Sequence, residues 1–166
     1  MVEKEKTLAD AFYETLKDVY WAEKHSVKAC KKSAKAAQAP ELKAAFEKHA
    51  EESAHQVERL TQVFESIGKA ARAKTCEATQ GILSEMEEDL EEFGKTEAAD
   101  DVLIGCAQAL EHYEIARYGM LKAWAARLGL SDAVELLGET LEEEKAADEK
   151  LSSIAGSFPA LELARR

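Results

Sequence analysis

The sequence predicts an all-α fold, a bundle of four long helices with an additional helix in the crossover between the second and third. Only two prolines and eight glycines interrupt its 166 residues. Apolar residues recur about every 3.6 positions over long stretches, which is the period of an α-helix. Tight turns and one long connection separate these stretches. The length suits a single domain, residues 1–166, with a core at about 7–155 and a loose tail at 156–166.

The first two long helices are predicted at about 7–38 and 41–67. Thr7 is a candidate N-cap, with Asp10 three residues later, as in a capping box. Pro40 ends the first helix and suits the start of the second, because proline fits the first helical position. The short turn between these helices makes them antiparallel.

The other two long helices are predicted at about 97–128 and from Ser131 to about 155, with Ser131 as an N-cap. They also form an antiparallel pair. The segment between the pairs contains a predicted helix at 74–93, about 20 residues or roughly 30 Å long. This helix can carry the chain back along the bundle, so that the second and third long helices run parallel. One long crossover of this kind is typical of ferritin-like bundles.

Carboxylates interrupt the apolar stripes of all four long helices. They are Glu23, Glu52, Glu111, Glu114, Glu144 and Asp148. Acidic residues are rarely buried unless they are paired or bind a metal. The two hairpins bring all six acids to a similar depth, where a shared pair of divalent cations would remove their repulsion. Hard oxygen ligands with at most one or two imidazoles favour iron or manganese, and suit magnesium or calcium less well. The sequence therefore predicts two iron or manganese ions held by these acids.

Three polar residues of the second helix are further candidates for completing the metal site. His55 follows Glu52 at the Glu-x-x-His spacing of di-iron bundles. On a helical wheel, however, His49 and Gln56 face the core and His55 lies at the edge. We therefore expect His49 or Gln56, rather than His55, to approach the acids.

Composition argues against several classes of protein. The formal net charge of -11 does not suit nucleic acid or anionic membrane as a partner. No apolar run is long enough for a membrane span, and the charged N-terminus does not read as a signal peptide. The three cysteines, Cys30, Cys76 and Cys106, lack the spacing of a zinc ribbon. Their use fits a reducing, cytoplasmic location.

Five stretches of the chain carry a resemblance to a known family. They are Tyr20–His25, His49–Phe64, Lys74–Leu83, Glu111–Gly119 and Thr140–Leu151. The sequence Glu-His-Tyr-Glu-Ile-Ala, which begins the fourth stretch, is the most specific. Together they resemble the YciF-like family of the ferritin superfamily, in register over roughly residues 8–155. The resemblance implies a bacterial, cytoplasmic, homodimeric bundle linked to stress responses, with the six acids in the positions of the family's inward acids.

The YciF-like family looks similar to rubrerythrins, which also carry paired glutamates on the third helix. Rubrerythrins have a histidine where this chain has Asp148. They also have a rubredoxin-type iron site, for which this chain has no counterpart. Both differences argue against a rubrerythrin-type peroxidase activity.

Two functions from different classes follow from these observations. The first is a dinuclear iron or manganese protein of redox or metal-handling type, in which Glu52 and Glu144 bridge the ions. A small oxidant such as oxygen or peroxide would bind at an open position, near a tyrosine donor (Tyr20, Tyr113 or Tyr118). The alternative is a non-catalytic stress or interaction protein. Its buried acids would share protons with the core histidine and glutamine, or hold a structural cation.

Overall fold

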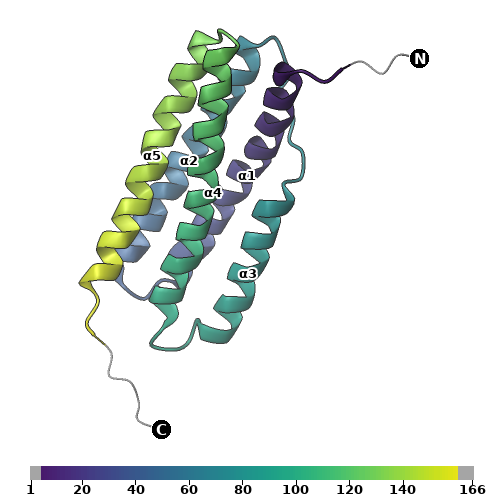
Figure 1. Cartoon of the computed structure of the whole chain (residues 1–166). Helices are drawn as coiled ribbons and strands as arrows, with labels where there is room; N and C mark the ends of the chain where they lie inside the picture. The colour runs from purple at the N-terminus through teal and green to yellow at the C-terminus, as the bar shows by residue number, and fades with distance from the viewer. Residues whose placement is uncertain (1–4, 161–166) are drawn as a thin grey trace.

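The computed structural model describes residues 5–160, which form five helices and no strand. Figure 1 shows four long helices side by side, and a shorter helix packed on their outside. The long helices are α1 (Leu8–Ala36), α2 (Pro40–Ser66), α4 (Ala99–Arg127) and α5 (Ser131–Ser157), and the shorter one is α3 (Glu77–Phe93). The predicted all-α, ferritin-like four-helix bundle with an additional crossover helix is confirmed.

The direction of each helix matches the predicted topology. In Figure 1, α1 and α2 are antiparallel, α4 and α5 are antiparallel, and α2 and α4 run in the same direction. The crossover helix is shorter than predicted, because residues 67–76 are not helical and α3 begins at Glu77. The backbone N–H of Lys74 donates to the carbonyl oxygen of Lys17 at 3.2 Å, which ties the extended part of the crossover to α1. The α3 helix then packs against α1 and α4.

The predicted starts of α1 and α2 are confirmed. The Thr7 side chain accepts a hydrogen bond from the Asp10 backbone, and the Asp10 carboxylate accepts one from the Thr7 backbone at 2.8 Å. These two bonds satisfy N–H groups that have no partner within the helix. Pro40 is the first residue of α2, where its missing N–H costs nothing.

The predicted N-cap of α5 is wrong. Leu130 occupies the cap position, and Ser131 is already the first helical residue. The Ser131 hydroxyl donates to the Asp132 carboxylate at 3.3 Å instead of accepting a backbone bond. The reason is the turn before it, where Gly129 adopts a φ of 72° and reverses the chain within three residues.

Two apolar clusters fill the two ends of the bundle. One contains Leu16, Phe64, Leu121 and Leu137, and the other contains Leu42, Leu103 and Ile154. Most of these side chains are almost wholly buried, so the apolar ends supply most of the hydrophobic stabilisation. Between the ends, all four long helices turn polar side chains inward. The bundle therefore has a buried polar layer at mid-height.

The C-terminal helix is longer than predicted. Residues 156–157, placed in a loose tail by the sequence, belong to α5. The rest of that predicted tail includes residues 161–166, which lie outside the described part of the chain. Among residues 5–160, no helix combines the length and the apolar character that a membrane span requires.

The two predicted caps provide a matched test of this local structure. Thr7→Ala removes a side chain that accepts a backbone hydrogen bond, so it should lower the free energy of unfolding by about 1 kcal/mol. Ser131→Ala removes no such bond and should change it by less than about 0.5 kcal/mol. Urea unfolding followed by circular dichroism measures both values. Equal losses in the two variants would contradict the cap assignment.

Candidate metal centre

The polar layer is built from helix positions that follow the same inward stripe as the apolar core. Its members are spread over four helices: Glu23 and Ser26 on α1, His49, Ser53 and Gln56 on α2, Glu111 and Glu114 on α4, and Thr140 and Glu144 on α5. None of these residues is more than 6% exposed. The sequence pattern placed the carboxylates inward because they share a helix face with apolar residues such as Val19, Leu110 and Leu141.

Four members of this layer converge on one point. Ligand atoms of His49, Glu111, Glu114 and Glu144 all lie within 4.8 Å of one another. The Nε2 atom of His49 is 3.0 Å from a Glu111 oxygen and 3.6 Å from a Glu144 oxygen. We call these four residues the core cluster. It joins α2, α4 and α5 at mid-height.

Two hydroxyl groups orient carboxylates of the layer. The Tyr118 hydroxyl donates to Glu23 at 2.6 Å, and the Ser26 hydroxyl donates to Glu114 at 2.6 Å. Tyr118 is one of three tyrosines that the sequence analysis considered as donors. The role of Ser26 was missed, although a serine three residues after Glu23 on the inward face was a usable signal.

Many polar atoms of the layer lack a hydrogen-bond partner among the described residues. They include both oxygens of Glu144 and one oxygen each of Glu23, Glu111 and Glu114. The Nδ1 atom of His49 and the amide oxygen of Gln56 are in the same situation. Buried polar groups are nearly always satisfied in proteins. Five unpartnered carboxylate oxygens in one layer therefore indicate a place for cations or shared protons.

The protonation behaviour of the layer reflects its burial. Burial raises the pKa of Glu23 to about 7, although the Tyr118 hydrogen bond opposes the shift. Burial and the neighbouring carboxylates raise the pKa values of Glu114 and Glu144 well above their ordinary range. For His49, burial favours the neutral form, but the adjacent Glu111 and Glu52 carboxylates outweigh it and raise its pKa. A protonated His49 thus partly compensates the acids.

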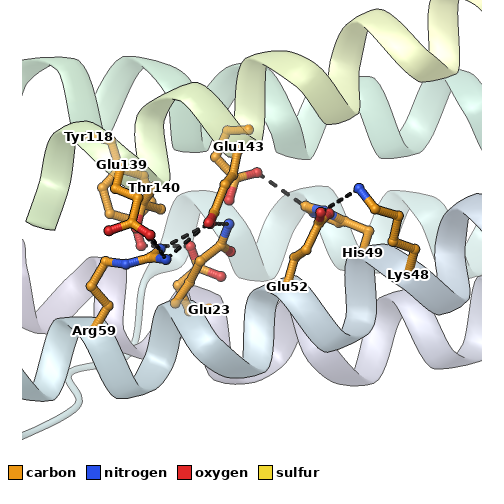
Figure 2. Close-up of polar contacts among 11 residues, drawn as sticks. Glu23, Lys48, His49, Glu52, Arg59, Tyr118, Glu139, Thr140 and Glu143 are labelled. Carbon is orange, nitrogen blue, oxygen red and sulfur yellow. Dashed lines mark hydrogen bonds and ion pairs between the residues drawn. The ribbon is translucent and has the colours of Figure 1, made fainter.

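Glu52 lies at the edge of the layer rather than at its centre. Its side chain is 27% exposed, and it pairs with Lys48 while approaching Nδ1 of His49 at 3.5 Å. The adjacent His49 imidazole and the Lys48 ammonium lower the pKa of Glu52 to about 2. Figure 2 shows Lys48, His49 and Glu52 together on one helix. Glu52 was expected among the inward acids of the four apolar stripes, so its partial exposure is a correction.

Asp148 does not join the other acids, so its expected inward orientation is also corrected. Its carboxylate accepts a hydrogen bond from the Gln108 amide at 3.0 Å and lies 3.1 Å from the His112 ring. These partners lie between the outer edges of α4 and α5, where His112 is mostly exposed. The Gln108 amide and the His112 imidazole, both on α4, provide hydrogen-bond partners for the Asp148 carboxylate, which explains why it turns away from the core.

The polar residues of α2 face the directions that the helical wheel predicts. His55 is exposed, whereas His49 and Gln56 are buried in the polar layer. The prediction that His49 rather than His55 approaches the acids is confirmed. Gln56 uses its amide nitrogen to donate to Glu143 at 3.0 Å.

An arginine beside the polar layer was missed as a functional residue by the sequence analysis. Figure 2 shows Arg59 reaching towards Glu139, Thr140 and Glu143. Arg59 binds both oxygens of Glu143 at 2.9 Å and donates to Thr140 at 2.7 Å. Burial opposes ionisation of Glu143, but the Arg59 hydrogen bonds lower its pKa overall. Arg59 lies on α2 and Glu143 on α5, so the pair depends on how these two helices face each other, which the pattern of a single helix does not contain.

The core cluster offers one imidazole and three carboxylates. Such a mixed nitrogen and oxygen donor set suits iron or manganese better than it suits a thiolate-preferring metal. The unpartnered oxygens of Glu144 are the best placed to bind a cation, since they lie beside both His49 and Glu111. The residues present therefore fit a divalent metal, with Glu23 and Glu52 at the margin of the cluster.

The chain is similar to several known proteins. Residues 7–164 match a family model described as "Domain of unknown function (DUF892)". Protein YciF of Escherichia coli K12 is 46% identical over 152 residues, which cover 90% of this chain and 91% of YciF.

Two solved structures share the fold over nearly their whole length. The E. coli stress protein YciF matches at 44% identity with a TM-score of 0.87, covering 91% of this chain and 96% of that structure. YcfI from Rhodopseudomonas palustris matches at 38% identity with a TM-score of 0.88, covering 92% and 98%.

The chelated protein should lose stability as the pH rises from about 5 to 8. The folded chain keeps protons on Glu23, Glu114 and Glu144 that the unfolded chain releases near pH 4.3. The free energy of unfolding therefore falls between the unfolded and folded pKa values, a window that ends at about 7 for Glu23. His49 adds to this trend, because its raised pKa stabilises the fold at low pH and that contribution disappears as the pH rises.

Thermal unfolding in chelator at half-unit pH steps measures this slope. Glu144→Gln removes one raised pKa and should flatten the decline. Glu142→Gln is the matched control, because Glu142 is exposed and its lowered pKa lies below the window. A wild-type melting temperature that stays constant from pH 5 to 8 would mean that these acids are not held protonated by the fold.

Proposed function

Because the chain belongs to the DUF892 family of YciF-like proteins, we propose that it is a ferritin-like protein that binds two iron or manganese ions. The ions would serve redox chemistry with oxygen or peroxide in a stress response. The E. coli relative is a stress protein by name. The observation that carries the proposal is the core cluster, whose ligand atoms gather within 4.8 Å in the middle of a bundle.

The residues in and around the polar layer differ in how they could serve the two ions. His49, Glu111 and Glu144 hold an ion on the α2 and α5 side, and Glu114 extends the cluster towards Glu23 on α1. Glu114 and Glu23 would hold the second ion. Glu52 would turn from Lys48 to the cluster if a divalent ion were bound there, since such an ion attracts it more strongly than an exposed ammonium does. Asp148 keeps its partners on α4.

The chain's own groups prepare the layer for cations. Tyr118 and Ser26 fix one oxygen each of Glu23 and Glu114, which leaves the other oxygen free to bind. Arg59 binds both carboxylate oxygens of Glu143 and so keeps this side chain beside the core cluster rather than within it. When bound, the ions supply a redox centre and a Lewis acid for a small oxidant.

We also propose a cytoplasmic homodimer. The three cysteines are all free, which fits a reducing compartment.

The alternative function remains a non-catalytic stress protein in which the acids share protons with His49. The short distance between His49 and Glu111 favours this alternative, because the pair compensates part of the charge without metal. Metal content after purification without chelator separates the two functions.

Glu144→Gln should abolish binding of two metal ions per chain. The substitution keeps the side-chain volume but removes the charge of the carboxylate that lies between His49 and the other acids. Glu142→Gln, on the same helix but exposed, should bind metal as the wild type does. Anaerobic titration with ferrous iron or manganese, followed by metal analysis, gives the stoichiometry. Two equivalents bound by Glu144→Gln at unchanged affinity would refute the proposed site.

Variants of the two histidines of α2 test whether the inward helix face or the Glu-x-x-His spacing defines the metal site. His49→Ala removes the imidazole of the core cluster and should weaken metal binding by about tenfold or more. His55→Ala removes an exposed side chain and should leave the affinity unchanged. Competition with a metal-sensitive dye measures both affinities. A larger loss in His55→Ala would show that the Glu-x-x-His spacing, not the inward face, defines the site.

A further inference from the structure

A groove between α2 and α5 leads from the surface to the core cluster. It encloses about 490 Å³. The apolar part of its wall consists mostly of small side chains, from Ala44, Ala45, Phe46, Ala146, Ala147 and Leu151, and paired charged side chains complete the lining. His49 and Glu111, both buried, line its inner part. We call this feature the α2–α5 groove.

The volume of the α2–α5 groove is much larger than dioxygen or hydrogen peroxide requires. A cavity of about 150 Å³ is enough to hold benzene, and the groove is roughly three times larger. Pockets of about 300–1,000 Å³ with apolar walls and a few polar groups typically bind small organic molecules. Small side chains on both helices create this space, since alanine at four facing positions leaves the helices apart at the surface.

The inner part of the groove offers more hydrogen-bond acceptors than donors, because the carboxylates of Glu52, Glu111 and Glu143 line it beside the single imidazole of His49. One Glu111 oxygen has no partner among the described residues. The lysines that line the groove are already engaged, because Lys48 pairs with Glu52 and Lys150 pairs with Glu41. His49 directs its Nε2 atom to Glu111. A molecule in the groove can therefore bring a donor to the carboxylates. An anionic head would meet a lining in which four carboxylates outnumber two lysines and His49, and a cationic head would repel the divalent ions proposed for the core cluster.

We propose that the α2–α5 groove binds a neutral organic molecule with an apolar body and a terminal hydroxyl or hydroperoxyl group, which donates to the carboxylates beside the core cluster. The inference rests on the proposed function and names the class of its substrate. The apolar body lies between the alanines of α2 and α5, where burial of its surface supplies the binding energy. The head lies next to Glu111 and His49, the ligands proposed on that side of the cluster.

Binding is tested first on the whole chelated protein with 1-hexanol as the probe. Alanine methyl groups labelled with ¹³C report its position, because four of them line the groove. Saturable shifts confined to these methyl groups, with a Kd in the roughly millimolar range, are expected for so small a ligand. Shifts spread over the surface, or none up to saturation of the solution, would overturn the proposal.

Variants of exposed alanines on α2 and α5 test the location. Ala146→Leu fills the groove and should weaken hexanol binding by about fivefold or more. Ala54→Leu is the matched control, since Ala54 is also exposed but lies outside the groove. Equal affinities in the two variants would refute the location. If Ala146→Leu, but not Ala54→Leu, dissociates a dimer in sedimentation experiments, a second copy covers the groove and the proposal fails.

Probes with the same body and different heads test the chemistry. Hexanoate should bind about tenfold more weakly than 1-hexanol, because its charge meets carboxylates. Equal binding of hexanoate, or tighter binding of hexylammonium than of 1-hexanol, would contradict a neutral donor head. Comparison of tert-butanol with tert-butyl hydroperoxide then distinguishes the two members of the class, since the one that binds more tightly is the preferred head.

The metal titration of Ala146→Leu separates this inference from the proposed function. Leucine adds no donor and removes no ligand, so the variant should still bind metal as the wild type does. Loss of hexanol binding with retained metal binding supports a separate organic pocket. Hexanol binding in a protein that takes up no metal would uphold the groove and reject the proposed function. Metal binding without hexanol binding would reject the groove alone.

Discussion

Burial of several carboxylates at one depth of a helical bundle is the constraint on which the rest of this structure depends. Four glutamates and a histidine lie almost without solvent contact at mid-height. Five of the carboxylate oxygens have no hydrogen-bond partner within the described chain. Such a layer costs folding energy unless charge is neutralised by protons or cations. The apolar clusters on either side supply the stabilisation that offsets this cost. The fold therefore maintains a site that its own packing does not favour.

The surroundings of the layer divide the charges into those that are compensated and those that are not. Glu52, Glu143 and Asp148 each have a partner that is a cation, an imidazole or an amide, and each is partly exposed. Both oxygens of Glu144 and one oxygen each of Glu114 and Glu111 have no hydrogen-bond partner among the described residues. These groups lie around His49, which compensates only part of their charge. This contrast locates the expected cation in the core cluster rather than along the whole acidic stripe.

The fold and much of the site could be predicted from the sequence because both follow from helical periodicity. The period identified the four long helices, placed Glu23, Glu111, Glu114 and Glu144 inside, and preferred His49 to His55. It failed where a neighbouring side chain decides the orientation, as Lys48 does for Glu52 and the Gln108 amide does for Asp148. It also could not reveal the Arg59 and Glu143 pair, or the α2–α5 groove. Both depend on how two helices face each other, which a single-helix pattern does not contain.

The most direct measurement of the central claim is a crystal structure of the manganese-loaded protein with anomalous scattering. The account predicts anomalous peaks inside the bundle, with one peak within coordination distance of His49 Nε2 and a Glu144 oxygen. Glu52 should then leave Lys48 and face the ions. A loaded crystal without any peak in the polar layer, in which His49 and the glutamates share protons among themselves, would contradict the account.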